Sequence, residues 1–317
     1  MIVTVTLNAA LDRTVSVPNF LLGQRHRASP GLTLAGGKGI NVARALKLLD
    51  VPVVATGLAG GRTGTRIVEE LTSEAILNDF VRIADESRTS TAVVDPTAAT
   101  YTEINEWGPR VEPDELTMLL DKISYLARGA DMVVFAGTLP RDVDESFYAH
   151  AIRDLNRRQV RAVLDSEGQP LRRGVEAEPY LVTPNQREAE GLVGQEFRDD
   201  EDYMMAVERI AEMGARNVLI TSETMSFGLF REERRRLRFR AEAPRVEPVS
   251  AVGSGDVLLA AFLAALVAER PLDESLRSAV AAGAASTLEV GAGRFDPREA
   301  GRLTKKVDVK ELEPVAG

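Results

Sequence analysis

The sequence predicts an α/β fold in which helices cover both faces of a mostly parallel central sheet. From about residue 51 onward, short apolar runs typical of buried strands alternate with longer segments of helical periodicity. This alternation is the pattern of β-α-β units, whose crossover helices pack on both faces of a parallel sheet. The chain has 317 residues and 44% hydrophobic content, which is enough to bury a large core.

The individual elements follow from this pattern. The predicted strands are short apolar runs at residues 1–7, 51–57, 132–136, 160–165, 180–183 and 217–221. The predicted helices have apolar residues at helical spacing and cover residues 65–77, 112–127, 145–158 and 202–213. A further helix begins near Gly39, and the apolar run 257–268 predicts a buried helix. Polar turns follow several strands, so we expect them to meet in one cleft at the carboxyl edge of the sheet.

Two segments, residues 13–34 and 88–106, carry strand-like residues without a helix between them. We expect them to pair as a small separate sheet, a lid over the cleft. The predicted organisation is therefore an α/β core made of residues 1–12, 35–87 and 107–310, with this β-lid inserted. Residues 311–317 form a tail, and we expect fraying from residue 309 onward.

Composition excludes several classes of site and partner. The chain has no cysteine, which excludes disulfides and thiolate metal sites, and two histidines, which argue against a multi-histidine metal centre. The net charge of −9 argues against a nucleic-acid surface. The N-terminus lacks a secretory signal, and the run 257–268 is shorter than the ~20 residues that cross a bilayer. We expect a cytoplasmic protein without membrane or nucleic-acid partners.

One stretch departs from the acidic average. Residues 13–49 contain no Asp or Glu but six basic residues, so we expect this stretch to bind an anion. Arg25, Arg27 and Lys38 lie in loop or strand context and are the candidates for that role. Arg44 and Lys47 fit the solvated face of the helix that begins near Gly39.

A second basic run covers residues 231–240. Its charges alternate with Leu237 and Phe239 at period two, which predicts an exposed edge strand. We assign this run no catalytic role.

The most informative motif is Val252-Gly253-Ser254-Gly255-Asp256, directly before the apolar helix. Two glycines allow close backbone approach, and N–H groups at a helix start favour an anion. An aspartate there is a poor phosphate ligand but a suitable base beside a reacting phosphoryl group. The motif therefore favours phosphoryl transfer, although such a turn also occurs as a plain tight connection. The glycine spacing matches neither the dinucleotide-binding pattern nor the Walker A loop.

Two further segments add to this motif. The glycine loop at 34–44 opens a helix and offers Gly37, Lys38 and Asn41, which suit sugar hydroxyls and a phosphate. The segment 183–188 places Asn185 and Glu188 about one helical turn apart, which suits magnesium bound through water.

In this order, these segments resemble the ribokinase-like carbohydrate kinases, and more closely their phosphofructokinase B branch. The resemblance runs from Thr4 to about Phe295. Its most specific pieces are residues 6–12, the Gly36 loop, residues 57–64, 88–90, 137–140 and 251–256. The resemblance implies a three-layer α/β/α sandwich with a β-lid that often forms a dimer contact.

Site roles implied by the resemblance are carried over residue by residue. The catalytic group is Asp256 as base, with Gly253, Ser254 and Gly255 as the anion hole that stabilises the transferring phosphoryl. The substrate group is Asp12, Gly37, Lys38, Asn41 and Thr138 around the sugar, with Arg88 on its phosphate and Arg25 and Arg27 as helpers from the lid. The nucleotide group is Asn185, Ser222, Gly253 and Gly255, with Glu188 at the magnesium ion.

The resemblance implies an ATP- and Mg²⁺-dependent kinase of a phosphorylated ketohexose, with K⁺ as a further candidate cofactor and a homodimer formed through the lid. The acceptor stays open among fructose 1-phosphate, fructose 6-phosphate and tagatose 6-phosphate. One alternative is a kinase of an unphosphorylated sugar or a nucleoside. Another is a non-catalytic sugar-phosphate-binding protein, because Thr183 stands where close relatives often carry lysine and Thr224 replaces a glycine common after Ser222.

Overall fold

The computed structural model describes residues 1–29, 31–98, 100–232 and 235–312. These residues form an eleven-stranded sheet and a separate four-stranded sheet. The large sheet runs in the order β15 (Asp308–Leu312), β14 (Arg235–Glu242), β13 (Met225–Glu232), β12 (Val218–Thr221), β11 (Leu181–Val182), β10 (Arg161–Asp165), β9 (Met132–Ala136), β1 (Ile2–Thr6), β4 (Val53–Gly60) and β5 (Leu77–Asn78), with β6 (Val81–Ile83) also on β4.

The central strands are parallel and buried on both faces. The chain pairs β1 with β4 and β9, β9 with β10, and β10 with β11, all in parallel, whereas β12 to β15 pair antiparallel. Alternate residues point to opposite faces of a strand, so Met132 and Val134 of β9 join one core cluster and Val133 and Phe135 join the other. Runs that are apolar at every position therefore form the buried centre of the sheet.

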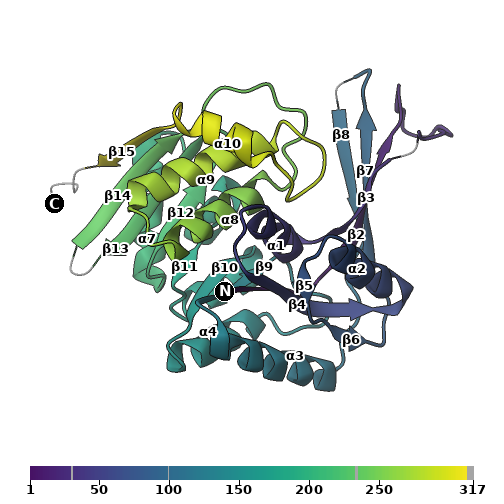
Figure 1. Cartoon of the computed structure of the whole chain (residues 1–317), viewed down its shortest axis with the longest axis horizontal. Helices are drawn as coiled ribbons and strands as arrows, with labels where there is room; N and C mark the ends of the chain where they lie inside the picture. The colour runs from purple at the N-terminus through teal and green to yellow at the C-terminus, as the bar shows by residue number, and fades with distance from the viewer. Residues whose placement is uncertain (30, 99, 233–234, 313–317) are drawn as a thin grey trace.

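Helices cover the two faces as separate layers. One layer contains α1 (Lys38–Leu48), α2 (Gly61–Ser73), α8 (Ser254–Val267), α9 (Leu272–Ser286) and α10 (Pro297–Thr304). The other contains α3 (Pro113–Leu126), α4 (Phe147–Arg157), α5 (Gly168–Val175), α6 (Gln186–Val193) and α7 (Asp200–Met213). In Figure 1, α9 and α10 lie toward the top of the view and α3 and α4 toward the bottom. The predicted three-layer fold is confirmed.

The small sheet stands away from the main body, at the right of Figure 1. Its order is β3 (Thr33–Gly36), β2 (Ala10–Ser16), β7 (Arg88–Asp95) and β8 (Thr100–Asn105). Strand β2 follows β1 after three residues, so the chain passes directly from the centre of the large sheet into the small one. The predicted separate sheet is confirmed, while the exact division into core and lid stays a prediction.

Some elements differ from the sequence prediction. Helix α2 begins at Gly61 and ends at Ser73, whereas the prediction ran from residue 65 to 77. Strand β14 lies between β13 and β15, so the prediction of an exposed edge strand at 231–240 was wrong. The expected fraying from residue 309 was also wrong for residues 309–312, which complete β15. Residues 313–317 of the predicted tail lie outside the described residues.

No helix in the described part of the chain is long and apolar enough to cross a membrane.

Candidate active site

A cavity of about 2100 Å³ opens at the carboxyl edge of the large sheet and reaches residues of the small sheet. Strands β1, β9, β10 and β12 all direct their carboxyl ends to it, as expected for a parallel sheet. Of the predicted site residues, those that line it are Asp12, Gly37, Lys38, Asn41, Arg88, Thr138, Asn185, Glu188, Ser222, Gly253, Ser254, Gly255 and Asp256.

The Gly253 turn begins α8. Gly253 is the N-cap residue, with a left-handed φ of 79°, and a Cβ there would lie 2.9 Å from Ala292. Only glycine fits this conformation and this contact. A Cβ on Gly255 would meet no heavy atom of the described chain within 4 Å, so space remains beside the first turn of α8. The N–H of Ser254 donates to the carbonyl of Ala251 at 3.3 Å, whereas the N–H of Gly255 has no partner among the described residues and can meet an anionic ligand.

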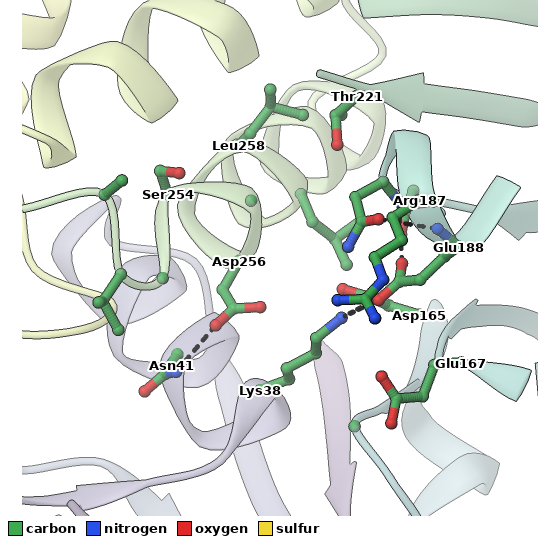
Figure 2. Close-up of a pocket in the computed structure, with 18 of the residues that line it drawn as sticks. Lys38, Asn41, Asp165, Glu167, Arg187, Glu188, Thr221, Ser254, Asp256 and Leu258 are labelled. Atoms are coloured by element: carbon green, nitrogen blue, oxygen red, sulfur yellow. Dashed lines mark hydrogen bonds and ion pairs between the residues drawn. The ribbon is translucent and has the colours of Figure 1, made fainter. Parts of the chain in front are cut away.

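Asp256 lies in the first turn of α8 and is 5% exposed. Its Oδ2 atom accepts a hydrogen bond of 2.8 Å from Nδ2 of Asn41 in α1. Figure 2 shows the carboxylate below α8, between Asn41 and Lys38. Burial, and after it the charge of Asp165, raise its pKa to about 7 against the opposing effects of Lys38 and Asn41. A carboxyl with such a pKa is poised to accept a proton near neutral pH.

Lys38, the first residue of α1, spans the cavity. Its Nζ atom lies 2.8 Å from Oδ1 of Asp165 and 3.2 Å from Oε1 of Glu188. Burial alone would lower the pKa of Lys38, but Asp165, Glu188 and Asp256 raise it above its usual value. Lys38 is therefore a fixed cation held between carboxylates.

Asn185 and Glu188 form a reciprocal capping box at the start of α6. Oδ1 of Asn185 accepts from the N–H of Glu188, and Oε2 of Glu188 accepts from the N–H of Asn185, both at 2.9 Å. The other carboxylate oxygen, Oε1, faces Lys38. The ordinary helix start considered from the sequence thus exists, and it leaves one oxygen of Glu188 directed at the cavity (Figure 2).

Asp12 and Arg88 come together from neighbouring strands of the small sheet. Burial, together with the nearby charge of Glu103 in β8, raises the pKa of Asp12 to about 6, although Arg88 opposes this shift. The guanidinium of Arg88 donates to the carbonyl of Asn8 at 3.2 Å, and Nδ2 of Asn8 donates to Thr138 at 3.0 Å. Asn8 therefore links the cation on the small sheet to the hydroxyl after β9.

Ser222 lines the cavity from the turn between β12 and β13. Its hydroxyl donates to the carbonyl of Met225 at 3.1 Å, so the side chain stabilises this turn. Leu258, Val280 and Ala284 of α8 and α9 add apolar surface to the cavity lining. Apolar lining of this kind suits a flat, partly apolar group.

Two predicted residues are not brought into the cavity. Arg25 and Arg27 are exposed in the segment between β2 and β3, and neither is among the described residues that line the cavity. The reason is that this segment continues outward along the small sheet, closed by the Ser16–Ser29 bridge. Their contact with substrate stays a prediction.

The expectation that Arg44 belongs to a solvated face was wrong. Arg44 is 4% exposed, and its partners are Glu74, Asn41 and the carbonyls of Ala35 and Ala292. Helix α1 is buried from Gly39 to Leu46, so this arginine has no solvent face to occupy.

The sequence placed Asp165 in a polar turn expected at the cleft and Asn8 in the 6–12 motif, but it predicted no role for either residue. Asp165 is the last residue of β10 and Asn8 follows β1, and both line the cavity. Their position at the carboxyl end of a buried strand was the available signal.

The sequence matches the family described as "pfkB family carbohydrate kinase" over residues 6–299. The chain belongs to this family. Among similar proteins, a 1-phosphofructokinase of Bacillus subtilis is 32% identical over 93% of this chain and 96% of its own length. A tagatose-6-phosphate kinase of Staphylococcus epidermidis is 28% identical over 98% of this chain and all of its own length.

Solved structures agree with this placement. Phosphofructokinase-2 of Escherichia coli in complex with fructose-6-phosphate has a TM-score of 0.87 and 27% identity. The same enzyme in complex with potassium has a TM-score of 0.89 and 28% identity. Each comparison covers 96% of this chain and 98% of the other. This pfkB-family chain is thus a phosphotransferase with an alcohol group as acceptor.

Proposed function

We propose that this chain transfers the γ-phosphate of ATP to a hydroxyl of a phosphorylated ketohexose. The observation that carries the proposal is a buried carboxylate, Asp256, in the first turn of α8, where the N–H of Gly255 has no partner among the described residues. This arrangement supplies both functions that a phosphoryl transfer to an alcohol needs, a base for the hydroxyl and a site for the negative charge that moves.

In the proposed reaction, Asp256 accepts the proton of the attacking sugar hydroxyl. Asn41 holds one oxygen of Asp256, so the other oxygen is the one available to the substrate. The N–H groups of the 253–255 turn stabilise the charge on the transferring phosphoryl group. Lys38 keeps its positive charge near Asp256, because the neighbouring carboxylates raise the pKa of its ammonium group.

Arg88 supports a phosphorylated acceptor rather than a free sugar. Its guanidinium lines the part of the cavity that the small sheet forms. It donates to the carbonyl of Asn8, whose side chain in turn donates to the hydroxyl of Thr138. A guanidinium fork binds phosphate oxygens through paired N–H groups. The carboxylate of Asp12, the third residue of β2, suits the sugar hydroxyls.

The site also fits ATP and Mg²⁺. Oxygens of Asp165 and Glu188 converge on the Lys38 ammonium, so this place already favours a cation. The described residues contain no group of three or more side chains that could hold a metal, and Mg²⁺ commonly takes one or two carboxylates with phosphate and water. When bound, Mg²⁺ would neutralise phosphate charge. Glu188, aided by Asn185, is the residue proposed to hold it, and Ser222 lies toward the nucleotide base.

Three further features belong to this proposal. The phosphofructokinase-2 complex with potassium supports K⁺ as a candidate cofactor. A homodimer through the small sheet and a cytoplasmic location remain predictions.

The experiment is an assay of ADP release with fructose 1-phosphate, fructose 6-phosphate and tagatose 6-phosphate, and with fructose as the unphosphorylated control. We expect ADP with at least one sugar phosphate and a kcat/KM for fructose lower by ~10²-fold or more, because Arg88 then lacks its anion. Equal turnover of fructose would favour a free-sugar kinase. Thermal stabilisation by a sugar phosphate without ADP would favour a non-catalytic binding protein.

A further inference from the structure

A buried guanidinium connects the base to the loop behind the anion hole. Arg44 of α1 is 4% exposed and lies one helical turn beyond Asn41. Its Nη1 atom donates to Oδ1 of Asn41 at 3.4 Å and to the carbonyl of Ala292 at 3.0 Å, and Nη2 donates to the carbonyl of Ala35 at 2.8 Å. Nε donates to Glu74 at 2.7 Å.

The contact with Asn41 fixes the direction of an amide. An asparagine side chain has one accepting oxygen and one donating nitrogen, and exchanging them inverts its hydrogen bonding. Because Arg44 can only donate, it requires the oxygen of Asn41 on its own side. The nitrogen of Asn41 is then directed at Oδ2 of Asp256, 2.8 Å away (Figure 2).

The contact of Arg44 with Ala292 affects the Gly253 turn. The 291–293 loop packs closely on both Gly253 and Asn41, since a Cβ on Gly253 would lie 2.9 Å from Ala292 and a Cβ on Gly293 would lie 2.6 Å from the carbonyl of Asn41. Arg44 holds the Ala292 carbonyl, so it fixes the surface against which the Gly253 turn rests.

We propose that Arg44 is a positioning residue for phosphoryl transfer, which sets the orientation of Asn41, and through it Asp256, and holds the 291–293 loop behind the Gly253 turn. The inference rests on the proposed function. It assigns to Arg44 no contact with substrate or nucleotide. A lysine cannot replace it, because one ammonium cannot reach the four acceptors that the planar guanidinium reaches together.

The test compares Arg44→Lys with wild type in the ADP assay. We expect kcat to fall by ~10–100-fold while KM for ATP changes by less than ~3-fold, because misplacing the base affects the chemical step and not nucleotide binding. A double-mutant cycle with Asn41→Ala identifies the route. In the Asn41→Ala background, Arg44→Lys should lower kcat by a smaller factor than it does in the wild type, because Asp256 has already lost its partner.

Arg238→Lys is the matched control. Arg238 is a largely buried arginine, with its side chain 14% exposed and paired with Glu208, and it lies outside the cavity lining. This variant also weakens a guanidinium–carboxylate pair, so it should lower thermal stability, by less than Arg44→Lys does, and leave kcat within ~3-fold of wild type.

A second variant tests the same inference if Arg44→Lys does not fold. The double variant Arg44→Met/Glu74→Leu replaces the Arg44–Glu74 ion pair with apolar side chains, an exchange that proteins often tolerate, and it leaves the half-exposed Arg294, the other partner of Glu74, to solvent. It should fold and show the same loss of kcat. Wild-type kcat in either folded Arg44 variant, or a loss confined to thermal stability, would overturn the inference alone. Absence of ADP formation by the wild type would overturn the proposed function together with it.

Discussion

At the scale of residues, the site is a set of charges whose pKa values are shifted by burial and by each other. Asp256 is buried with one neutral donor, Asn41, and the cation Lys38 is already paired with Asp165 and Glu188. Burial therefore dominates, and the pKa of Asp256 rises to about 7. We infer that the protein tolerates a buried carboxylate here because the reaction needs a base at this point.

This raised pKa predicts the stability of the Asp256→Asn variant. The carboxyl has a pKa of 3.8 when unperturbed and about 7 in the fold, so the folded state holds its proton more tightly than the unfolded state. Ionisation of Asp256 therefore costs stability progressively between about pH 4 and pH 7, and the full cost is present above pH 7. Asparagine carries no such cost. In a thermal melt at about pH 8, Asp256→Asn should have a higher Tm than wild type, and the difference should shrink toward about pH 4.

A lower Tm for Asp256→Asn at both pH values would contradict this account of the carboxyl. It would mean that the attraction between Asp256 and Lys38 outweighs the burial of the charge.

Several residue roles could be predicted from the sequence because they lie in contiguous motifs. The Gly253 turn and Asp256 stand together in the chain, and helical periodicity places them at the start of α8. Arg44 could not be placed in the same way, because a charged residue on a helix ordinarily faces solvent. Its burial depends on Ala292 and Glu74, which come from distant parts of the sequence. Arg25 and Arg27 were predicted from charge, which does not tell on which side of the small sheet they lie.

At the scale of elements, the start of α8 is the structure that the site requires most. Its N-cap glycine has φ near 79° and touches the 291–293 loop, while the helix behind it is buried on nearly all sides. Such a helix cannot shift to accommodate a side chain at its N-cap, because an interior of native packing density leaves it no room.

We predict that Gly253→Ala lowers the free energy of unfolding by ~1–3 kcal/mol and also lowers kcat. The added methyl group requires an unfavourable positive φ and meets Ala292 at 2.9 Å. Gly301→Ala is the control, because Gly301 lies within α10 and its Cβ would meet open space in the described chain. That substitution should raise stability by ~0.5–1 kcal/mol. Denaturant unfolding measures both, and equal stability of the two variants would refute the conformational argument.

Helices and strands could be predicted where the periodicity of apolar residues was strong, but the residues at which they begin and end could be predicted less well. The central strands follow from runs that are apolar at every position, as in β9. Strand β15 was missed because its residues Asp308–Leu312 are mostly polar and exposed, so pairing with β14 alone defines it as a strand. Such pairing depends on a partner about 70 residues away, which no local pattern reports.

At the scale of the whole molecule, the edge strand β8 of the small sheet is left uncovered by the described residues. All six residues of β8 are exposed, including Tyr101 at 46% and Ile104 at 56%, and Leu22 beyond the end of β2 is 90% exposed. Tyr101 and Ile104 lie on opposite faces of β8, and exposed apolar side chains such as these and Leu22 are typical of a contact surface. This observation supports the proposed homodimer through the small sheet.

We predict that the wild-type chain elutes as a dimer in size-exclusion chromatography with light scattering. The double variant Leu22→Asp/Ile104→Asp should elute as a monomer, because the added charges would be buried without partners in the interface. The control is Leu77→Asp, since Leu77 is 70% exposed on β5 of the large sheet and should leave the dimer intact. A monomeric wild type would contradict the proposal.

The central claim is that Asp256 accepts a proton from the sugar hydroxyl beside the N–H groups of the Gly253 turn. The most direct test is the turnover of Asp256→Asn in the ADP assay, with the best sugar phosphate at saturation. Asparagine keeps the shape of the side chain but cannot act as a base, so we expect kcat to fall by ~10²–10⁴-fold with the protein still folded. A kcat within ~3-fold of wild type would contradict the claim.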